Sequence, residues 1–274
     1  MKAKTKRVNK LADAYRISSY SELESFVAAF AAGKINLIIL VGEPGLAKSR
    51  TVKGLLPDAC WIEGNASPFG MYLKLFEHRD RLVVIDDVDS LYSDRNGIRL
   101  LKCLCQTDEQ KVVAWPTASR ELKREGVPRE FVTRSRVIII TNEWKTLNQN
   151  VAALQDRGHT LLFCPNAAEV HLKVSEWFTD EEIFSFLGEQ LHRVDRPSMR
   201  LYHRALELKS SGLEWRAILP EFPGNARARR AAELLQDPKY MTQRARVEEF
   251  VKSGAGCRAT FFNYARRLGH RHEP

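Results

Sequence analysis

Apolar positions follow two different spacings along the first 165 residues. Short runs of consecutive aliphatic and β-branched residues alternate with segments whose apolar residues recur at helical spacing. The runs cover residues 35–41, 60–63, 82–85 and 137–141, and the helical segments cover residues 19–30, 48–56 and 71–77. Strands that are apolar on both faces and alternate with helices are typical of a parallel sheet covered on both sides. The sequence therefore predicts an α/β fold in which helices sandwich a parallel sheet.

The strand-like runs end near Pro165, and the rest of the chain has helical spacing throughout. It predicts helices over residues 181–192, 197–208 and 213–218, which suit a small all-helical lid. The Glu-Phe-Pro-Gly segment at 221–224 is typical of a linker. We expect three parts, which are an α/β domain over residues 1–165, a helical lid over 166–220 and a basic helical tail over 221–274.

Composition and charge restrict the classes of partner. The 274 residues carry a net charge of +9, which favours an anionic partner such as DNA. No apolar run approaches the roughly 18 residues of a membrane span, and the basic first ten residues lead into no apolar signal core. We therefore expect a soluble, cytoplasmic protein with no membrane partner. The five cysteines lack the paired spacing of a zinc site or disulfide scaffold and are interpreted as buried apolar residues.

A phosphate-binding loop is indicated between the apolar run that ends at Val41 and the helical segment that follows. Small residues in such a loop let backbone N–H groups surround a triphosphate, and the helix N-terminus adds its positive dipole end. Lys48 would hold the β- and γ-phosphates, and Ser49 would bind Mg²⁺. The sequence thus predicts an ATP and Mg²⁺ site made of Gly42, Glu43, Pro44, Gly45, Leu46, Ala47, Lys48 and Ser49.

Ala47 departs from the general form of this loop, which has glycine before the lysine. A methyl group is tolerated there if the backbone does not need a positive φ angle. The segment Gly-Glu-Pro-Gly-Leu-Ala-Lys-Ser resembles the loops of minichromosome-maintenance helicases and MoxR-type ATPases, which also carry alanine at this position.

Two carboxylates, Asp86 and Asp87, follow the apolar run at 82–85. Ligand sites of parallel α/β sheets lie at the carboxyl ends of the strands, so these acids and the loop are expected at one edge. Asp86 is the predicted Mg²⁺ carboxylate, and Asp87 is placed to polarise the attacking water. The alternative is that both residues cap the next turn.

Another apolar run, 138–141, ends at Asn142, and the three motifs together resemble the AAA+ family of P-loop ATPases. The resemblance covers about residues 15–220 and implies that residues 1–165 form the nucleotide-binding domain. It also implies that Asn142 is the first sensor, which positions the lytic water. A turn-forming asparagine is the alternative. Asp87 stands where the family usually has glutamate, so its carboxylate is one methylene shorter.

Two arginines complete the catalytic set that the resemblance implies. Arg157, in the segment Ala-Ala-Leu-Gln-Asp-Arg, would be an arginine finger acting on the neighbouring subunit's ATP, which requires a homo-oligomer, a ring or a spiral. Arg200 would be the second sensor over the γ-phosphate, with Arg196 close enough to be confused with it. The alternative for Arg157 is a surface arginine near the sheet edge.

Two basic segments are candidates for contact with nucleic acid. The first, residues 111–136, precedes the run that ends at Asn142, and a solvated charged face is its alternative. Its charged residues are Lys111, Arg120, Lys123, Arg124, Arg129, Arg134 and Arg136, with Glu121, Glu125 and Glu130.

The second segment predicts helices over residues 244–251 and 258–268 and resembles a helix-turn-helix, with 226–235 as a possible third helix. Arg258, Asn263, Arg266 and Arg267 lie away from the apolar face of its last helix. A packing or oligomerisation helix pair is the alternative.

The leading hypothesis from the sequence is an AAA+ ATPase that remodels or loads factors on DNA, as a replication, transposition or mobile-element helper. A protein-remodelling chaperone with a protein client is the first alternative. A nucleotide-dependent scaffold with little turnover is the second.

Overall fold

The computed structural model of the chain describes residues 14–115, 120–143, 153–191, 194, 198–216 and 226–267. The chain separates into two compact units, Met1–Pro165 and Asn166–Pro274. Each unit is described by itself below. The further division near residue 220 remains a prediction.

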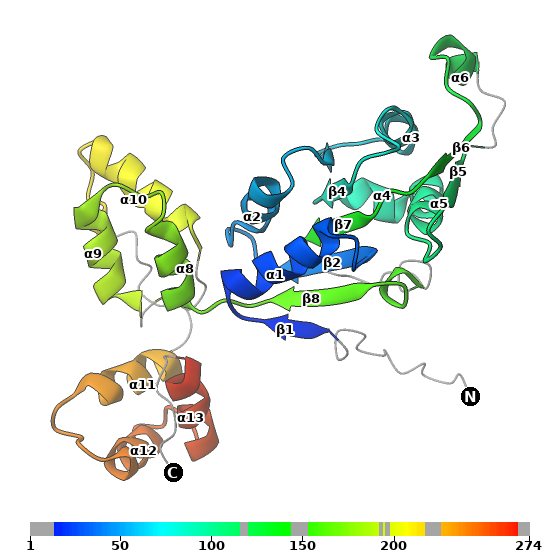
Figure 1. The fold of residues 1–274 in the computed structure, drawn as a ribbon. Helices are drawn as coiled ribbons and strands as arrows, with labels where there is room; N and C mark the ends of the chain where they lie inside the picture. Colours follow the sequence, from blue (N-terminus) through cyan, green and yellow to red (C-terminus); the bar gives the residue numbers. More distant parts are fainter. Residues whose placement is uncertain are drawn as a thin grey trace, which may run out of the picture. The chain divides into compact units, whose positions relative to one another are not determined.

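The first unit is built on a six-stranded sheet in which every neighbouring pair of strands is parallel. Its order, shown in Figure 1, is β1 (Tyr15–Ile17), β8 (His159–Phe163), β2 (Leu37–Gly42), β7 (Val137–Thr141), β4 (Val83–Asp86) and β3 (Cys60–Glu63). The predicted α/β fold is confirmed. Strands β1 and β8 were not predicted, because β1 has only three residues and β8 begins with the polar pair His159 and Thr160.

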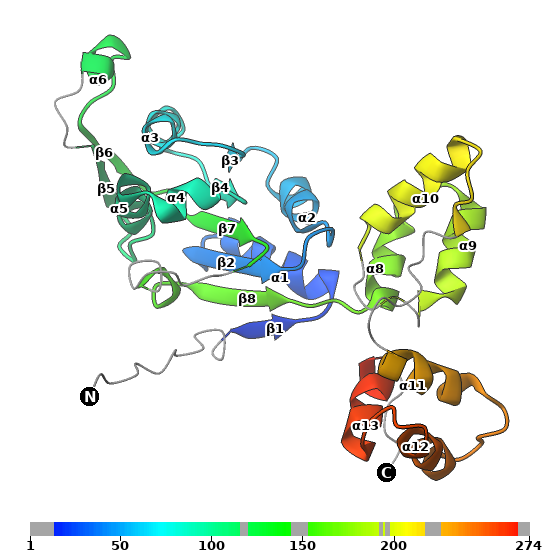
Figure 2. The same cartoon turned by 180° about the vertical axis from the view of Figure 1, so that it is seen from behind.

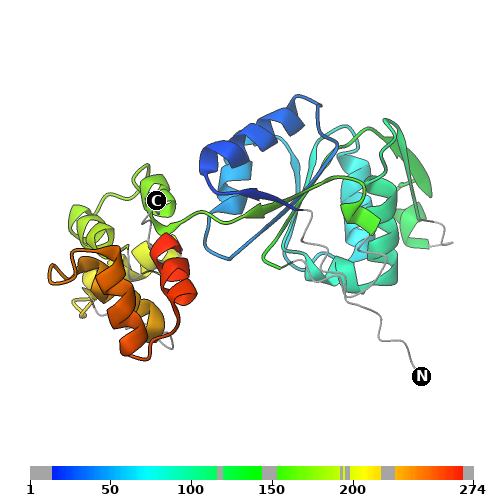
Figure 3. The same ribbon diagram turned by 90° about the horizontal axis from the view of Figure 1, so that it is seen from below.

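Helices cover both faces of this sheet, and Figure 3 shows them on its two sides. On one side lie α1 (Tyr20–Ala31) and α2 (Lys48–Leu55), and on the other lie α3 (Pro68–Glu77), α4 (Asp89–Ser93) and α5 (Arg95–Leu104). Every residue of β2 and β7 is therefore buried, as expected for central strands of a covered parallel sheet.

Side-chain caps explain where the helices of the first unit begin. Ser19 and Glu22 form a capping box at the start of α1, Ser67 caps α3 directly before Pro68, and Asp94 caps α5. Such caps satisfy backbone N–H groups that have no partner within the helix.

A two-stranded antiparallel hairpin occupies the basic segment 111–136 and extends away from the large sheet (Figure 2). It consists of β5 (Lys111–Ala114) and β6 (Glu130–Thr133), with α6 (Arg120–Arg124) between them in the chain. Lys111 was expected on a nucleic-acid surface, and this is wrong, because its side chain is 1% exposed. Its Nζ donates hydrogen bonds to Asn36 Oδ1 at 2.9 Å and to the Ser135 carbonyl at 2.7 Å, so Lys111 anchors the base of the hairpin.

The described part of the second unit is helical, as expected for a lid. It begins with α8 (Ala167–Val174), α9 (Glu181–Glu189) and α10 (Arg200–Ser210). The helix predicted over 213–218 does not form at residues 213–215, because Gly212 turns the chain with a φ of 69° and Trp215 is buried instead. Residues 217 and 218 lie outside the described residues.

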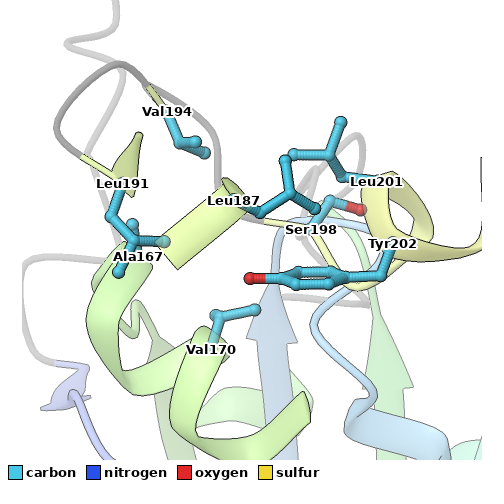
Figure 4. Close-up of a pocket in the computed structure, with 8 residues that line it drawn as sticks. All are labelled: Ala167, Val170, Leu187, Leu191, Val194, Ser198, Leu201 and Tyr202. Atoms are coloured by element: carbon cyan, nitrogen blue, oxygen red, sulfur yellow. The ribbon is translucent and has the colours of Figure 1, made fainter. Parts of the chain in front are cut away.

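A small apolar pocket lies among α8, α9, α10 and the segment before α10 (Figure 4). The Tyr202 hydroxyl is hydrogen-bonded to Nδ1 of His171 at 2.7 Å. Burial lowers the pKa of His171 and raises that of Tyr202, so both side chains are neutral at pH 7. The pocket lining is Ala167, Val170, Leu187, Leu191, Val194, Ser198, Leu201 and Tyr202.

Three further helices follow, α11 (Ala226–Gln236), α12 (Gln243–Lys252) and α13 (Arg258–Arg267). They share a core of their own, made of Ala231, Leu234, Leu235, Val247, Phe250, Phe261 and Ala265. Both predicted tail helices and the third helix at 226–235 are present. Across all described ranges, no helix is long and apolar enough to cross a membrane.

Candidate functional site

The candidate site lies at the carboxyl ends of strands β2, β4 and β7. The register aligns Val41 with Thr141 and Asp86 with Ile140, so these strands end nearly level. Strand β2 is flanked by β7 on one side and β8 on the other, although the chain visits β3 and β4 before it reaches either. The loop after β2 therefore begins at a topological switch point, where α/β sheets bind ligands.

Two glycines of the loop are needed for different reasons. A Cβ atom on Gly42 would lie 2.8 Å from the Phe163 carbonyl oxygen and 3.3 Å from Cδ of Lys48, so no side chain fits there. Gly45 has a φ of 82°, in the left-handed region that favours glycine. The loop is also held from α1, because the Tyr20 hydroxyl donates to the Leu46 carbonyl at 3.0 Å.

Ala47 occupies a left-handed backbone conformation, with a φ of 53° at the N-cap of α2. The condition under which its methyl group would be tolerated, a φ that is not positive, is therefore not met. The Cβ atom of an L-residue in this region approaches the following carbonyl oxygen, at a cost of roughly 1–2 kcal/mol. The loop thus carries local strain that glycine would not.

We expect Ala47→Gly to raise the free energy of unfolding by about 0.5–1 kcal/mol, because relief of this strain exceeds the extra backbone entropy that glycine loses. Urea denaturation of the full chain measures the change. Ala32→Gly is the matched control, since Ala32 ends α1 with a φ of −72°, and its substitution should destabilise or leave stability unchanged. Equal effects of the two substitutions would contradict the strain at Ala47.

Lys48 is the most buried charged group of the loop, with 6% of its surface exposed. Its Nζ donates to the carbonyls of Gly42 and Glu43 at 2.7 and 2.9 Å, and to Oδ1 of Asn142 at 3.1 Å. These three acceptors are neutral, and the charge of Lys48 also acts on the nearby Asp86 carboxylate. A phosphate oxygen would therefore be a stronger partner for Lys48 than any of the three.

Asn142 links Asp87 to Lys48 through hydrogen bonds of its side-chain amide. Oδ2 of Asp87 accepts a hydrogen bond from Nδ2 of Asn142 at 2.9 Å, and the Asp87 backbone N–H donates to the Ile140 carbonyl at 3.0 Å. Asp87 has a φ of 53°, which aspartate adopts more readily than most residues. Its exposed carboxylate is thus held by both its backbone and the Asn142 amide, at the mouth of the loop.

Asp86 and Ser49 form the second contact of the site. Burial raises the pKa of Asp86 above its usual range, as do the neighbouring charges of Glu63 and Asp87, while a hydrogen bond with Ser49 and the charge of Lys48 oppose the shift. A hydroxyl and a carboxylate are oxygen ligands of the kind that Mg²⁺ prefers. The described residues contain no group of three or more His, Cys, Asp or Glu that could hold a metal, so phosphate and water would supply the other ligands.

The other two predicted site residues are Arg157 and Arg200. Nη1 of Arg157 donates to the Lys102 carbonyl at 2.7 Å, just before β8 starts, so Arg157 lies at the opposite edge of the sheet from the loop. Arg200 begins α10 in the second unit and is exposed. Both assigned roles remain predictions, and Arg196 lies outside the described residues.

Tyr20 and Phe163 are parts of the site that the sequence did not reveal. The Tyr20 hydroxyl donates to the Leu46 carbonyl, and the Phe163 carbonyl leaves no room for a side chain at Gly42. The rings of Tyr20 and Phe163 pack edge to face with centroids 5.1 Å apart. Neither residue belongs to a local motif. Only the pairing of β2 with β8 and the packing of α1 show that they touch the loop.

No family model matches the chain. An uncharacterized 36.7 kDa protein of Enterobacteria phage T4, from the nrdC–mobD intergenic region, is 33% identical over 120 residues. The match covers 40% of this chain and 37% of the phage protein, so the chain spans little more than a third of that relative. The crystal structure of NtrX from Brucella abortus in complex with ATP is similar over 92% of this chain and 68% of that chain, with 14% identity and a TM-score of 0.45.

The residues and their geometry lead to one structural conclusion. The chain has an α/β fold that brings Lys48, Asn142 and Asp87 into one hydrogen-bonded row and joins Ser49 to Asp86 beside it.

Proposed function

We propose that this protein is an ATPase of the AAA+ type that binds Mg²⁺-ATP at the loop 42–49 and uses hydrolysis to remodel or load factors on DNA. The observation that carries the proposal is the row Lys48–Asn142–Asp87, with hydrogen bonds of 3.1 and 2.9 Å. It joins a phosphate-binding cation to a carboxylate through an amide that can orient water. If Asp87 only capped the turn that follows β4, it would not need the hydrogen bond that links it to Asn142.

The proposed chemistry assigns one task to each side chain. Lys48 binds the β- and γ-phosphates, and the backbone N–H groups at the start of α2 bind their oxygens. Asp87 accepts the proton of a water molecule whose oxygen attacks the γ-phosphorus, while the bond to the β,γ-bridging oxygen breaks and releases ADP and phosphate. Asn142 orients Asp87 and that water. Ser49 and Asp86 would hold Mg²⁺, which would supply positive charge to offset the negative charge of the phosphates.

Two further arginines complete the proposed site. Arg157 would act on the ATP of the neighbouring subunit, which agrees with its place at the edge of the sheet opposite its own loop. Arg200 would approach the γ-phosphate from the lid. The proposal therefore includes a homo-oligomer, a ring or a spiral, because a contact between two different faces repeats from subunit to subunit.

Phosphate release from ATP, measured with and without double-stranded and single-stranded DNA, tests the proposal. We expect turnover that depends on Lys48 and rises severalfold with DNA. Turnover indifferent to DNA would favour a protein-remodelling ATPase with a protein client. Absence of turnover under every condition would overturn the hydrolytic function.

A nucleotide-dependent scaffold with little turnover is the second candidate. The strained Ala47 and the short Asp87 carboxylate favour it. A scaffold would assemble on ATP, as measured by light scattering, and would release no phosphate.

A further inference from the structure

The helices α11, α12 and α13 carry most of the chain's excess positive charge. Residues 226–267 contain ten lysines and arginines against four acidic residues, a net charge of +6 within a chain of +9. Because these helices share their own core, the charge belongs to one small folded surface and not to an extended tail. A surface of this kind attracts a polyanion by releasing the polyanion's counterions.

Three of the four acidic residues of this three-helix group lie on α11 and α12, and the fourth, Asp237, directly follows α11. Glu249 and Glu233 pair with Arg230 at 3.2 Å each, and Glu248 pairs with Arg244 at 2.8 Å, all on α11 and α12. Helix α13 contains no acidic residue. Arg258, Arg266 and Arg267 therefore give α13 a charge of +3, half of the group's net +6, with no carboxylate on the same helix.

Helix α13 has a buried face and a polar face. Phe261 and Ala265 are 0% and 4% exposed and pack into the core, while Arg258, Asn263 and Arg266 are exposed. The exposed types match the edges of bases in the major groove, since arginine pairs with guanine and asparagine with adenine.

A tight turn at residues 253–257 joins α12 to α13 and holds the second helix firmly. Gly254 has a φ of 71°, and a Cβ atom on Gly256 would lie 3.0 Å from Thr260 and 3.3 Å from the Phe250 ring. Phe250 also meets Phe261 edge to face, with centroids 5.3 Å apart. These contacts fix the orientation of α13 on α12, and a helix that binds in the major groove needs such a fixed orientation.

We propose that α13 enters the major groove of double-stranded DNA, with Arg258, Asn263 and Arg266 as the contacting side chains. This inference rests on the DNA-associated function proposed above and names its binding surface. The hairpin β5–β6 is a weaker candidate, because Lys111 is buried at its base and glutamates are interspersed among its exposed cations.

Fluorescence anisotropy of the full chain with a labelled duplex of about 30 base pairs, roughly three helical turns, tests the proposal. We expect Arg258→Ala and Arg266→Ala each to weaken binding about fivefold or more, and to lower the slope of log K against log salt by about one where the arginine contacts phosphate. Asn263→Ala should reduce discrimination between duplex sequences and leave the salt slope unchanged. Thermal unfolding checks that each variant is folded.

Arg244→Ala is the matched control, because it removes one exposed arginine from the same helical group but from α12, where Arg244 pairs with Glu248. An equal loss of affinity in Arg244→Ala, or tighter binding of single-stranded DNA than of duplex, would overturn the proposal. Two results together would support it. The double variant Arg258→Ala/Arg266→Ala would lose duplex binding and keep its ATP turnover measured without DNA, and Lys48→Ala would still bind the duplex. Absence of ATP turnover with intact duplex binding would contradict the ATPase function alone. ATP turnover without duplex binding would contradict the α13 surface alone.

Discussion

Lys48→Ala should lower ATP turnover by about 10²–10³-fold, the loss typical for removal of one preorganised electrostatic partner of a reacting oxygen. The effect is expected to be large because Lys48 is buried, so its charge acts on a phosphate with little screening by water. Phosphate release measures the loss of turnover, and the binding of a fluorescent ATP analogue measures the loss of nucleotide affinity.

Lys53→Ala is the control for this substitution. Lys53 lies on the same helix, but it is exposed and its Nζ is 3.5 Å from Glu63. Its loss should change turnover by less than about twofold, since exposed ion pairs contribute little. Lys48→Met retains most of the volume of the lysine stem and separates the loss of charge from a packing defect. Turnover above a tenth of the wild-type rate in both Lys48 variants would contradict the assigned role.

Asp87→Asn should lower the rate of the hydrolytic step by about 10²–10⁴-fold, the usual contribution of a positioned general base, and leave ATP binding nearly unchanged. Asparagine has the same shape and also tolerates a left-handed backbone, so the φ of 53° can persist while the proton acceptor is lost. Single-turnover phosphate release and equilibrium nucleotide binding separate the two steps.

Asp80→Asn provides the comparison, because Asp80 is exposed and precedes β4, whereas Asp87 follows it. The control should keep full activity. Loss of nucleotide binding together with turnover in Asp87→Asn would mean that Asp87 acts in binding and not as a base. An unchanged rate would remove Asp87 from the mechanism and favour the scaffold function.

Local sequence was sufficient for the central strands and for the position of the loop. The run at 137–141 coincides with the central strand β7, because all of its residues are buried, and the run at 60–63 coincides with the edge strand β3, which is buried except for Glu63. Strand β1 and the hairpin β5–β6 were not predicted, since three-residue and partly exposed strands depend on their partners more than on their own composition.

The same division holds within the candidate site. The sequence by itself determined which groups are candidates to bind phosphate and magnesium, because glycine spacing, Lys48 and Ser49 are local features, and because Asp86 and Asn142 stand at the ends of apolar runs. Only the tertiary structure decided that Asn142 joins Lys48 to Asp87 and that Tyr20 supports the loop. The physical reason is that these contacts depend on strand order and helix packing, which bring together residues that are distant in the chain.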